Sequence, residues 1–253
     1  MVSIGSLCYD KITGAIGCSQ EAYIDRLLLK YGMENANACK LPMDPGCDLD
    51  SLPILDTPDK IVVHAYAALI GELLYIAIST VPQLSYSMSS LARYMSKETP
   101  AHLTYAEVVL RHLIGIKKKQ LTWCGQRVSL PHILGEILAF VDSSWADDKN
   151  NRRSSMVYYL FVNNATFSWH ATLSQIIAFS TTEAELMALA GCCCEIMWAC
   201  KLALVLGFPQ LKATDVSKTI LVALLLLTTC TFVVAVSTLL CEYALFRNSF
   251  KTD

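Results

Sequence analysis

The stretch FSTTEAELMALA, residues 179–190, decides the predicted fold because it marks the point where strands give way to a long helix. Its residues 180–183, STTE, match a capping box, in which the serine hydroxyl accepts a hydrogen bond from the amide of Glu183 and the glutamate reaches back. Apolar residues at helical spacing follow, and the helix is expected to end near Leu206, before Gly207.

A second acid, Glu185, is left over once the helix start is explained. Successive residues in a helix lie about 100° apart, so Glu183 and Glu185 point about 200° apart and cannot serve one site. Capping accounts for Glu183. No cap needs Glu185, which stands directly before an apolar Leu-Met-Ala run, and we take it as a candidate for chemistry.

Upstream of this helix the hydrophobic pattern has the period of strands, and a short extended run follows the helix. Strands alternating with a helix in this way predict an α/β fold with a sheet and flanking helices. The strands are expected at 136–145, on both sides of a tight turn within 154–172, at 175–179 (QIIAF) and at 212–215 (KATD).

Three carboxylates fall where elements of this pattern begin or end. Asp142 lies at the end of the first strand, Glu185 near the start of the long helix, and Asp215 after the last short strand. Such side chains meet at the rim of a sheet, where hard oxygen ligands suit Mg²⁺, and two such ions clamp the attacking and leaving oxygens in phosphoryl transfer. The residues alone indicate either a two-metal site or ordinary surface acids.

The first half of the chain has a different pattern. Residues 1–45 predict a strand pair followed by a helix with Ser19 as its cap. The Pro-, Asp- and Gly-rich stretch at 44–62 is typical of a linker. Residues 66–115 show helical spacing interrupted twice by proline, which ends one helix and starts the next.

The composition argues against a strongly basic nucleic-acid scaffold, because only 17% of residues are charged and the net charge is −2. A local groove is still compatible with the basic runs at 117–119 and 152–153, which otherwise are solvated loop charges. Trp145 and Trp169 either pack against the sheet or stack on a base.

Eleven cysteines without CxxC or zinc-like spacing predict buried free thiols in a reducing compartment. The N-terminus lacks the basic start and apolar core of a secretory signal.

The uncharged run from Thr219 to Cys241 is long enough to span a bilayer as a helix, which takes about 20 residues. Its Thr and Val content also suits a buried strand pair. Insertion would place the protein in a membrane; otherwise a cytoplasmic or nuclear location is expected.

Four segments carry a resemblance to a known family. The segments 14–33 (GAIGCSQEAYIDRLLLKYGM) and 66–79 (YAALIGELLYIAIS) are similar to its G-x-I-x-L-S-Q-x-x-Y-I-x-x-L-L-x-x-F-G-M and Y-x-x-L-I-G-S-L-L-Y-L patterns. The segments 140–148 (FVDSSWADD) and 179–190 are similar to Y-S-D-A-D-W-A-G-D and A-L-S-S-T-E-A-E-Y-x-A-L. Over residues 1–223 the chain resembles the C-terminal part of the Pol polyprotein of copia-type long-terminal-repeat retrotransposons, from the end of the reverse transcriptase through most of the ribonuclease H domain.

This resemblance implies a ribonuclease H-like mixed sheet with flanking helices. It implies that Asp142, Glu185 and Asp215 are the catalytic acids and bind two Mg²⁺ ions, which activate a water to cut the RNA strand of an RNA–DNA hybrid. No small-molecule cofactor is implied. The expected organisation is a thumb-like reverse transcriptase remnant at 1–45, a linker and helical connection segment at 46–133, an incomplete ribonuclease H-like domain at 134–223 and an apolar C-terminal helix at 219–241.

The chain also departs from the family. Ser144 stands at the domain's second aspartate position, and residues 172–174 lack the lysines of the family's K-K-Q. The polymerase's Y-x-D-D pair has no counterpart, so we expect no polymerase activity. The uncharged run replaces the family ending. Because this ending, the second aspartate and the lysines are missing, we expect weak or absent hybrid cleavage. The alternative is a non-catalytic transposon-derived protein, anchored in a membrane by its last segment.

Overall fold

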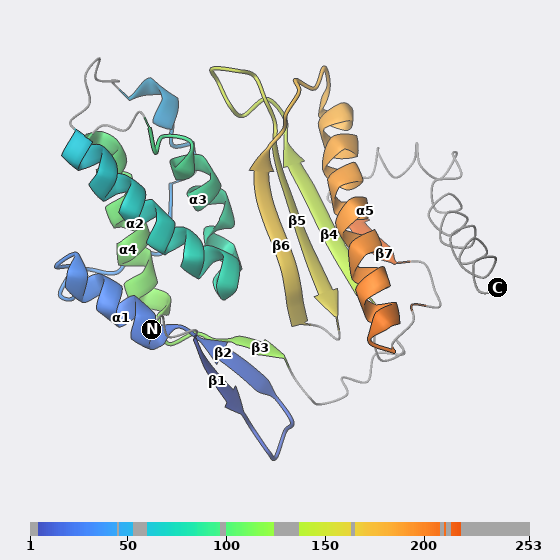
Figure 1. The fold of residues 1–253 in the computed structure, drawn as a ribbon. Coiled ribbons are helices and arrows are strands. Elements are labelled where there is room, and N and C mark those ends of the chain that lie inside the picture. The colour runs from blue at the N-terminus through green and yellow to red at the C-terminus, as the bar shows by residue number, and fades with distance from the viewer. Residues whose placement is uncertain are drawn as a thin grey trace, which may run out of the picture.

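The fold combines two sheets with five α-helices in the part of the chain that the computed structural model describes (Figure 1). That part comprises residues 5–44, 46–52, 60–96, 100–123, 137–162, 165–207, 210 and 214–218. The predicted α/β class is confirmed. The run at 219–241, predicted to be a membrane helix or a strand pair, lies outside the described residues.

The N-terminal part is a strand pair followed by a helix, as predicted. Its elements are β1 (Ser6–Tyr9), β2 (Ile16–Ser19), α1 (Glu21–Lys30) and, from later in the chain, β3 (Leu121–Trp123). The three strands form an antiparallel sheet in the order β1-β2-β3. Ser19 was predicted as the cap of α1, but the N-cap is Gln20 and the Ser19 hydroxyl accepts from the Glu21 amide at 3.2 Å.

The middle of the chain is helical, with breaks at the two predicted prolines. The elements are the 3₁₀ turns η1 (Leu49–Ser51) and η2 (Pro82–Leu84) and the helices α2 (Lys60–Ser79), α3 (Ser85–Ala92) and α4 (Pro100–Ile116). Proline opens both η2 and α4, a position where its missing N–H needs no partner. These helices and α1 share one hydrophobic core, which contains the fully buried Tyr66, Leu73 and Leu110. We call this group the helical layer.

The second sheet consists of β4 (Ile137–Ser144), β5 (Ser155–Val162), β6 (Ala165–Leu173) and β7 (Asp215–Lys218). The strand order is β6-β5-β4-β7, and the sheet is mixed because β7 is parallel to β4 while the other pairs are antiparallel. The strand predicted at 175–179 is wrong: this segment is a loop in which Ile176 and Ile177 are more than half exposed. The strand predicted at 212–215 instead begins at Asp215.

One face of this sheet is covered by α5 (Thr181–Val205), which shares a core with alternate residues of β4 such as Ala139 and Val141 (Figure 1). The start of α5 confirms the predicted capping. The amide of Glu183 donates to Ser180 Oγ at 3.1 Å, and Glu183 Oε2 accepts from the amide of Phe179 at 2.6 Å. The carboxylate therefore reaches back one residue beyond the N-cap.

The opposite face of the sheet contacts the helical layer, with α3 beside β6 (Figure 1). The Trp169 indole N–H donates to the Ala77 carbonyl at 2.9 Å, and the Tyr159 hydroxyl donates to the Pro82 carbonyl at 3.2 Å. Trp169 therefore packs between the sheet and the helices, the first of the two roles considered for it. These hydrogen bonds satisfy the polar groups of half-buried aromatic side chains at the contact between the second sheet and the helical layer.

Candidate functional site

Asp142 lies near the end of β4 and is exposed to solvent. Side chains alternate along a strand, and the core residues Ala139 and Val141 point toward α5. Asp142 therefore points to the face that α5 does not cover. Its neighbours on that face include Phe140, whose ring packs edge-to-face on Phe161 with ring centroids 5.4 Å apart.

Glu185 lies in the second turn of α5 and is 1% exposed, among the residues that face the sheet. The helix begins at the same end of the sheet at which β4 ends. Leu173 at the end of β6 pairs with Ser155, which pairs with Ser144 at the end of β4. Ala178, three residues before α5, accepts from the Trp145 indole, which follows β4 directly. Asp142 and Glu185 therefore lie at one end of the sheet but belong to opposite faces of it.

Asp215 is the first residue of β7 and pairs with Leu138 of β4. Leu138 stands four residues before Asp142, so the two aspartates are separated by about 13 Å along the strand direction, at about 3.3 Å per residue. Paired residues point to the same face, which places Asp215 and Asp142 on one face. The structure thus brings Asp142 and Glu185 to one end of the sheet but leaves Asp215 away from both.

These positions decide whether the three acids suit a metal pair. Two Mg²⁺ ions in a phosphoryl-transfer site lie about 3.5–4 Å apart and share carboxylate ligands. Within the described residues, no three His, Cys, Asp or Glu side chains form a group that could hold a metal ion. As the acids stand, their arrangement does not fit two magnesium ions, and the role of Asp142, Glu185 and Asp215 as metal ligands stays a prediction.

A further acid, Asp148, lies at the same end of the sheet as Asp142. Asp148 is buried whereas Asp142 is exposed, and the sequence pattern did not predict this burial. Its side chain is 1% exposed and lies 3.3 Å from the guanidinium of Arg93 in the helical layer. It also accepts from the Asn150 amide and the Asn151 side chain, each at 3.3 Å. Asp148 therefore joins the loop after β4 to the helical layer.

The same loop holds an exposed aromatic group. Trp145 is 41% exposed, and its indole N–H donates to the Ala178 carbonyl at 2.9 Å. The guanidinium of Arg152 lies over this ring, 5.6 Å from its centroid. Phe179, the next residue after Ala178, is 89% exposed. We call Trp145, Arg152 and Phe179 the aromatic patch. Trp145 and Arg152 lie between β4 and β5, and Phe179 lies between β6 and α5, so the sequence pattern did not predict that they are neighbouring parts of the surface.

The conformation of Arg152 is held by the backbone. Its φ is +54°, in the left-handed region that few residues other than glycine adopt. The Arg152 amide donates to the Asp148 carbonyl at 2.7 Å, which stabilises this turn. The buried acid and the exposed guanidinium are thus parts of one loop structure.

The predicted basic runs have different surroundings. Lys117 Nζ lies 2.7 Å from Asp25 Oδ1, whereas Lys118 and Lys119 are exposed at the end of the helical layer. The run at 152–153 is at the sheet end that carries Asp142 and supplies the cation of the aromatic patch.

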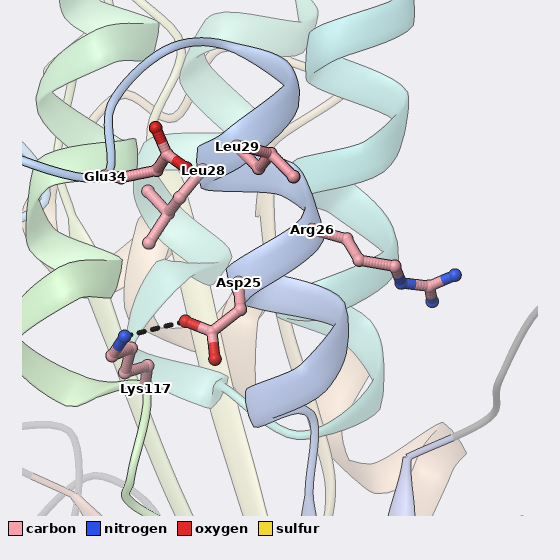
Figure 2. Close-up of a pocket in the computed structure, with 6 residues that line it drawn as sticks. All are labelled: Asp25, Arg26, Leu28, Leu29, Glu34 and Lys117. Carbon is pink, nitrogen blue, oxygen red and sulfur yellow. Dashed lines mark hydrogen bonds and ion pairs between the residues drawn. The ribbon is translucent and has the colours of Figure 1, made fainter.

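A surface hollow in the helical layer is formed by α1 and the residues after α4. Figure 2 shows Lys117 and Asp25 joined across it. The lining residues are Asp25, Arg26, Leu28, Leu29, Glu34 and Lys117. Because its Lys117 and Asp25 are already paired with each other, we do not assign chemistry to this hollow.

The cysteines correct part of the sequence prediction. The eight in the described residues are free thiols, and Cys192 and Cys200 are buried, but Cys8 and Cys194 are exposed. Burial raises the pKa of the Cys192 thiol to about 12, which keeps it protonated and unreactive at neutral pH.

Two described helices, Val62–Ser79 and Thr181–Val205, are long and apolar enough to cross a membrane by length and composition alone. A core helix of a soluble protein passes the same test, and both of these helices contribute to the cores described above.

Comparison with known proteins finds relatives among transposon polyproteins. The chain is 28% identical over 195 residues to the retrovirus-related Pol polyprotein from transposon TNT 1-94 of Nicotiana tabacum, covering 76% of the chain and 14% of that protein. It is 28% identical over 198 residues to the corresponding polyprotein from transposon RE1 of Arabidopsis thaliana, covering 78% of the chain and 13% of that protein. The chain is similar to transposon Pol polyproteins.

A shorter relative is the secreted RxLR effector protein 161 of Plasmopara viticola, 29% identical over 133 residues that cover 53% of the chain and 89% of that protein. The chain spans about one seventh of the length of the two polyproteins. No protein-family model and no solved structure matches it.

Proposed function

We propose that the chain is a transposon-derived Pol fragment whose second sheet and α5 form a ribonuclease H-like domain. This domain binds RNA–DNA hybrids at the sheet end that carries Asp142 and cleaves them weakly or not at all. The observation that carries the proposal is that Asp142 and Glu185 lie at the same end of a mixed sheet, although on opposite faces of it, in a chain similar to Pol polyproteins.

The aromatic patch supports a nucleic-acid substrate at this end. Exposed aromatic rings offer stacking surfaces to bases, and guanidinium groups bind phosphates and stack on bases as well. The patch combines both, with Arg152 over the Trp145 ring and the exposed Phe179 next in the chain to Ala178, whose carbonyl the Trp145 indole bonds. The carboxylates of the same loop are engaged internally: Asp148 with Arg93, and Asp147 Oδ1 with the Ser155 amide at 2.8 Å.

The separation of the acids supports weak or absent cleavage. Catalysis of phosphoryl transfer depends on positioning and charge stabilisation, and Asp215 pairs four residues away from Asp142. A second candidate function, a hybrid-binding protein with no nuclease activity, is favoured by the same observation. This second candidate is the limiting case of the first, in which no residual cleavage exists.

The test combines the full chain with a labelled RNA–DNA hybrid, with and without Mg²⁺, and measures binding by anisotropy and cleavage on a gel. We expect binding that weakens as salt rises. Any Mg²⁺-dependent cleavage should be slow and should be lost in Asp142→Asn without a change in binding. No cleavage would favour the non-catalytic candidate, and no binding would overturn the proposal. Asp215→Asn discriminates further: in the described register it leaves cleavage unchanged, whereas a loss equal to that of Asp142→Asn would require β7 to shift along β4.

The aromatic patch has its own test. Phe179→Ala is expected to weaken hybrid binding about tenfold, since base–aromatic stacking contributes about 1–3 kcal/mol per base. Tyr9→Ala removes an aromatic side chain that is 62% exposed on β1 and serves as the matched control, with unchanged affinity. Equal effects of the two substitutions would remove the patch from the binding surface.

A further inference from the structure

The side of α5 that faces away from the sheet carries two charged side chains, Glu183 near its start and Lys201 near its end. From 183 to 201 is about five full turns of an α-helix, so both project from the same side, about 27 Å apart along the axis. The two other charged residues of α5 do not share this side: Glu185 is 1% exposed, and Glu195 accepts from the Ser168 hydroxyl at 2.8 Å.

Between these two charges the same side of α5 is apolar and exposed. Ala190 and Cys194 lie equally far before and after the midpoint of the span, at position 192, and so do Leu186 and Trp198 further out. All four are exposed, Trp198 by 53%. Small side chains therefore mark the middle, large apolar ones flank them, and one charge of each sign closes each end. We call this surface the outer face; its residues are Glu183, Leu186, Ala190, Cys194, Trp198 and Lys201.

We propose that the outer face binds the same face of a second copy of this chain, with the two α5 helices antiparallel. A two-fold axis at the level of position 192 brings Glu183 of one copy level with Lys201 of the other, at both ends of the contact. In a parallel pair each charge would instead meet its own kind, which repels. Charge complementarity therefore selects the antiparallel arrangement and its register, and a two-fold contact between identical surfaces is the commonest form of homo-oligomer.

The middle of the outer face permits the close approach that the ion pairs need. Ala190 of one copy lies level with Cys194 of the other, and such small side chains let helix axes come within about 8 Å, the lower end of the range for packed helices. At a crossing angle of about 20° the axes are still only about 9 Å apart at the level of the charges, whereas at about 50° they are about 14 Å apart. The ion pairs therefore favour the shallow crossing.

The capping role of Glu183 is compatible with this contact. Its Oε2 accepts from the Phe179 amide at 2.6 Å, and a carboxylate has two oxygens that together accept several hydrogen bonds. A contact of one helix per copy is at the small end of specific interfaces. We therefore expect a dimer that forms as the protein concentration rises through the micromolar range.

The test is sedimentation velocity on the full chain over that range of concentration. Lys201→Glu sets two acids level with each other at both ends and should weaken the dimer about tenfold. Adding Glu183→Gln to Lys201→Glu removes this repulsion and should recover part of the loss, while glutamine still suits the capping box. Lys118→Glu makes the same charge change at an exposed residue of the helical layer and is the matched control, with an unchanged dimer.

Ala190→Arg places bulk and like charges at the centre of the contact and should abolish the dimer. Because Ala190 is exposed, the fold should be kept, which circular dichroism checks. A chain that stays monomeric throughout, or a dimer that Ala190→Arg leaves intact, would overturn the proposal. A further loss on adding Glu183→Gln would refute the antiparallel register. Flotation of the monomer with phosphatidylcholine vesicles, lost in Ala190→Arg, would assign the outer face to a membrane instead.

Discussion

The ion pair between Arg93 and Asp148 is expected to stabilise the contact between the helical layer and the second sheet. The Asp148 side chain is 1% exposed and the Arg93 side chain is 33% exposed. The distance from a guanidinium nitrogen of Arg93 to Asp148 Oδ2 is 3.3 Å. Removing one partner from a fully buried pair costs about 3–5 kcal/mol, because a charge is left buried, whereas exposed pairs contribute at most about 1 kcal/mol. Arg93 is partly hydrated and the separation is long, so Arg93→Met should lower the free energy of unfolding by about 2 kcal/mol.

The assay is urea denaturation followed by tryptophan fluorescence on Arg93→Met, Asp148→Asn and the double variant. Partners in contact are coupled, so the double variant should lose less than the sum of the single ones, with a coupling energy of about 1–2 kcal/mol. Asn150 and Asn151 still bind the carboxylate in Arg93→Met, which limits the loss.

A matched control comes from the same loop. Lys149 and Asp48 also join the sheet loop to the helical layer, at a shorter distance of 2.7 Å, but their side chains are 67% and 25% exposed. If burial rather than distance decides the strength of a pair, the same cycle on Lys149 and Asp48 should give clearly weaker coupling. Equal or stronger coupling for the exposed pair, or additivity for Arg93 and Asp148, would refute this reasoning.

Three further perturbations test the fold. Ser180→Ala removes the cap of α5 and should lower the free energy of unfolding by about 1 kcal/mol, with exposed Thr181→Ala as the control, both measured by urea denaturation. Leu160→Ala opens a cavity at a fully buried position and should lower the free energy of unfolding by about 2–5 kcal/mol in the same assay. The control Leu204→Ala, at a residue that is 47% exposed, should lower it far less. Burial lowers the pKa of His112 below its ordinary 6.5. As the pH falls, the unfolded chain therefore binds the proton before the folded chain does. The stability that His112 contributes is complete above about pH 6.5 and is lost as the pH falls below that value. His112→Gln should therefore flatten the acid side of the stability curve, and an unchanged slope would contradict the assignment.

The sequence predicted the elements whose signals are local. Residues 180–183 predicted the start of α5, because the cap and its carboxylate lie within one turn of each other. The two prolines predicted the helix breaks for the same reason. The failure at 175–179 has a physical cause as well: two adjacent isoleucines favour a strand, but no neighbouring strand is available to pair with them in the described sheet.

The candidate site depended on long-range pairing and packing, which local sequence patterns do not reveal. Strand periodicity fixes the alternation in β4 but does not say which face α5 will cover, so the opposite orientations of Asp142 and Glu185 were not predictable. The pairing of Asp215 with Leu138 is set after a helix of 25 residues and a connecting loop. A shift of β7 by four residues would bring Asp215 beside Asp142 without changing any local signal.

Asp148 connects the stability of the molecule to the proposed binding surface. Its carboxylate holds Arg93 of the helical layer, and its carbonyl accepts the amide of Arg152. Arg152 in turn stacks on Trp145, whose indole bonds the carbonyl of Ala178, the residue before Phe179. Each step is a short-range contact, yet together they extend from α3 to the exposed ring at the end of the sheet. The Asp148 carboxylate ties this loop to the helical layer, and the ordered loop holds Arg152 and Trp145 in place before a ligand arrives, which lowers the entropic cost of binding.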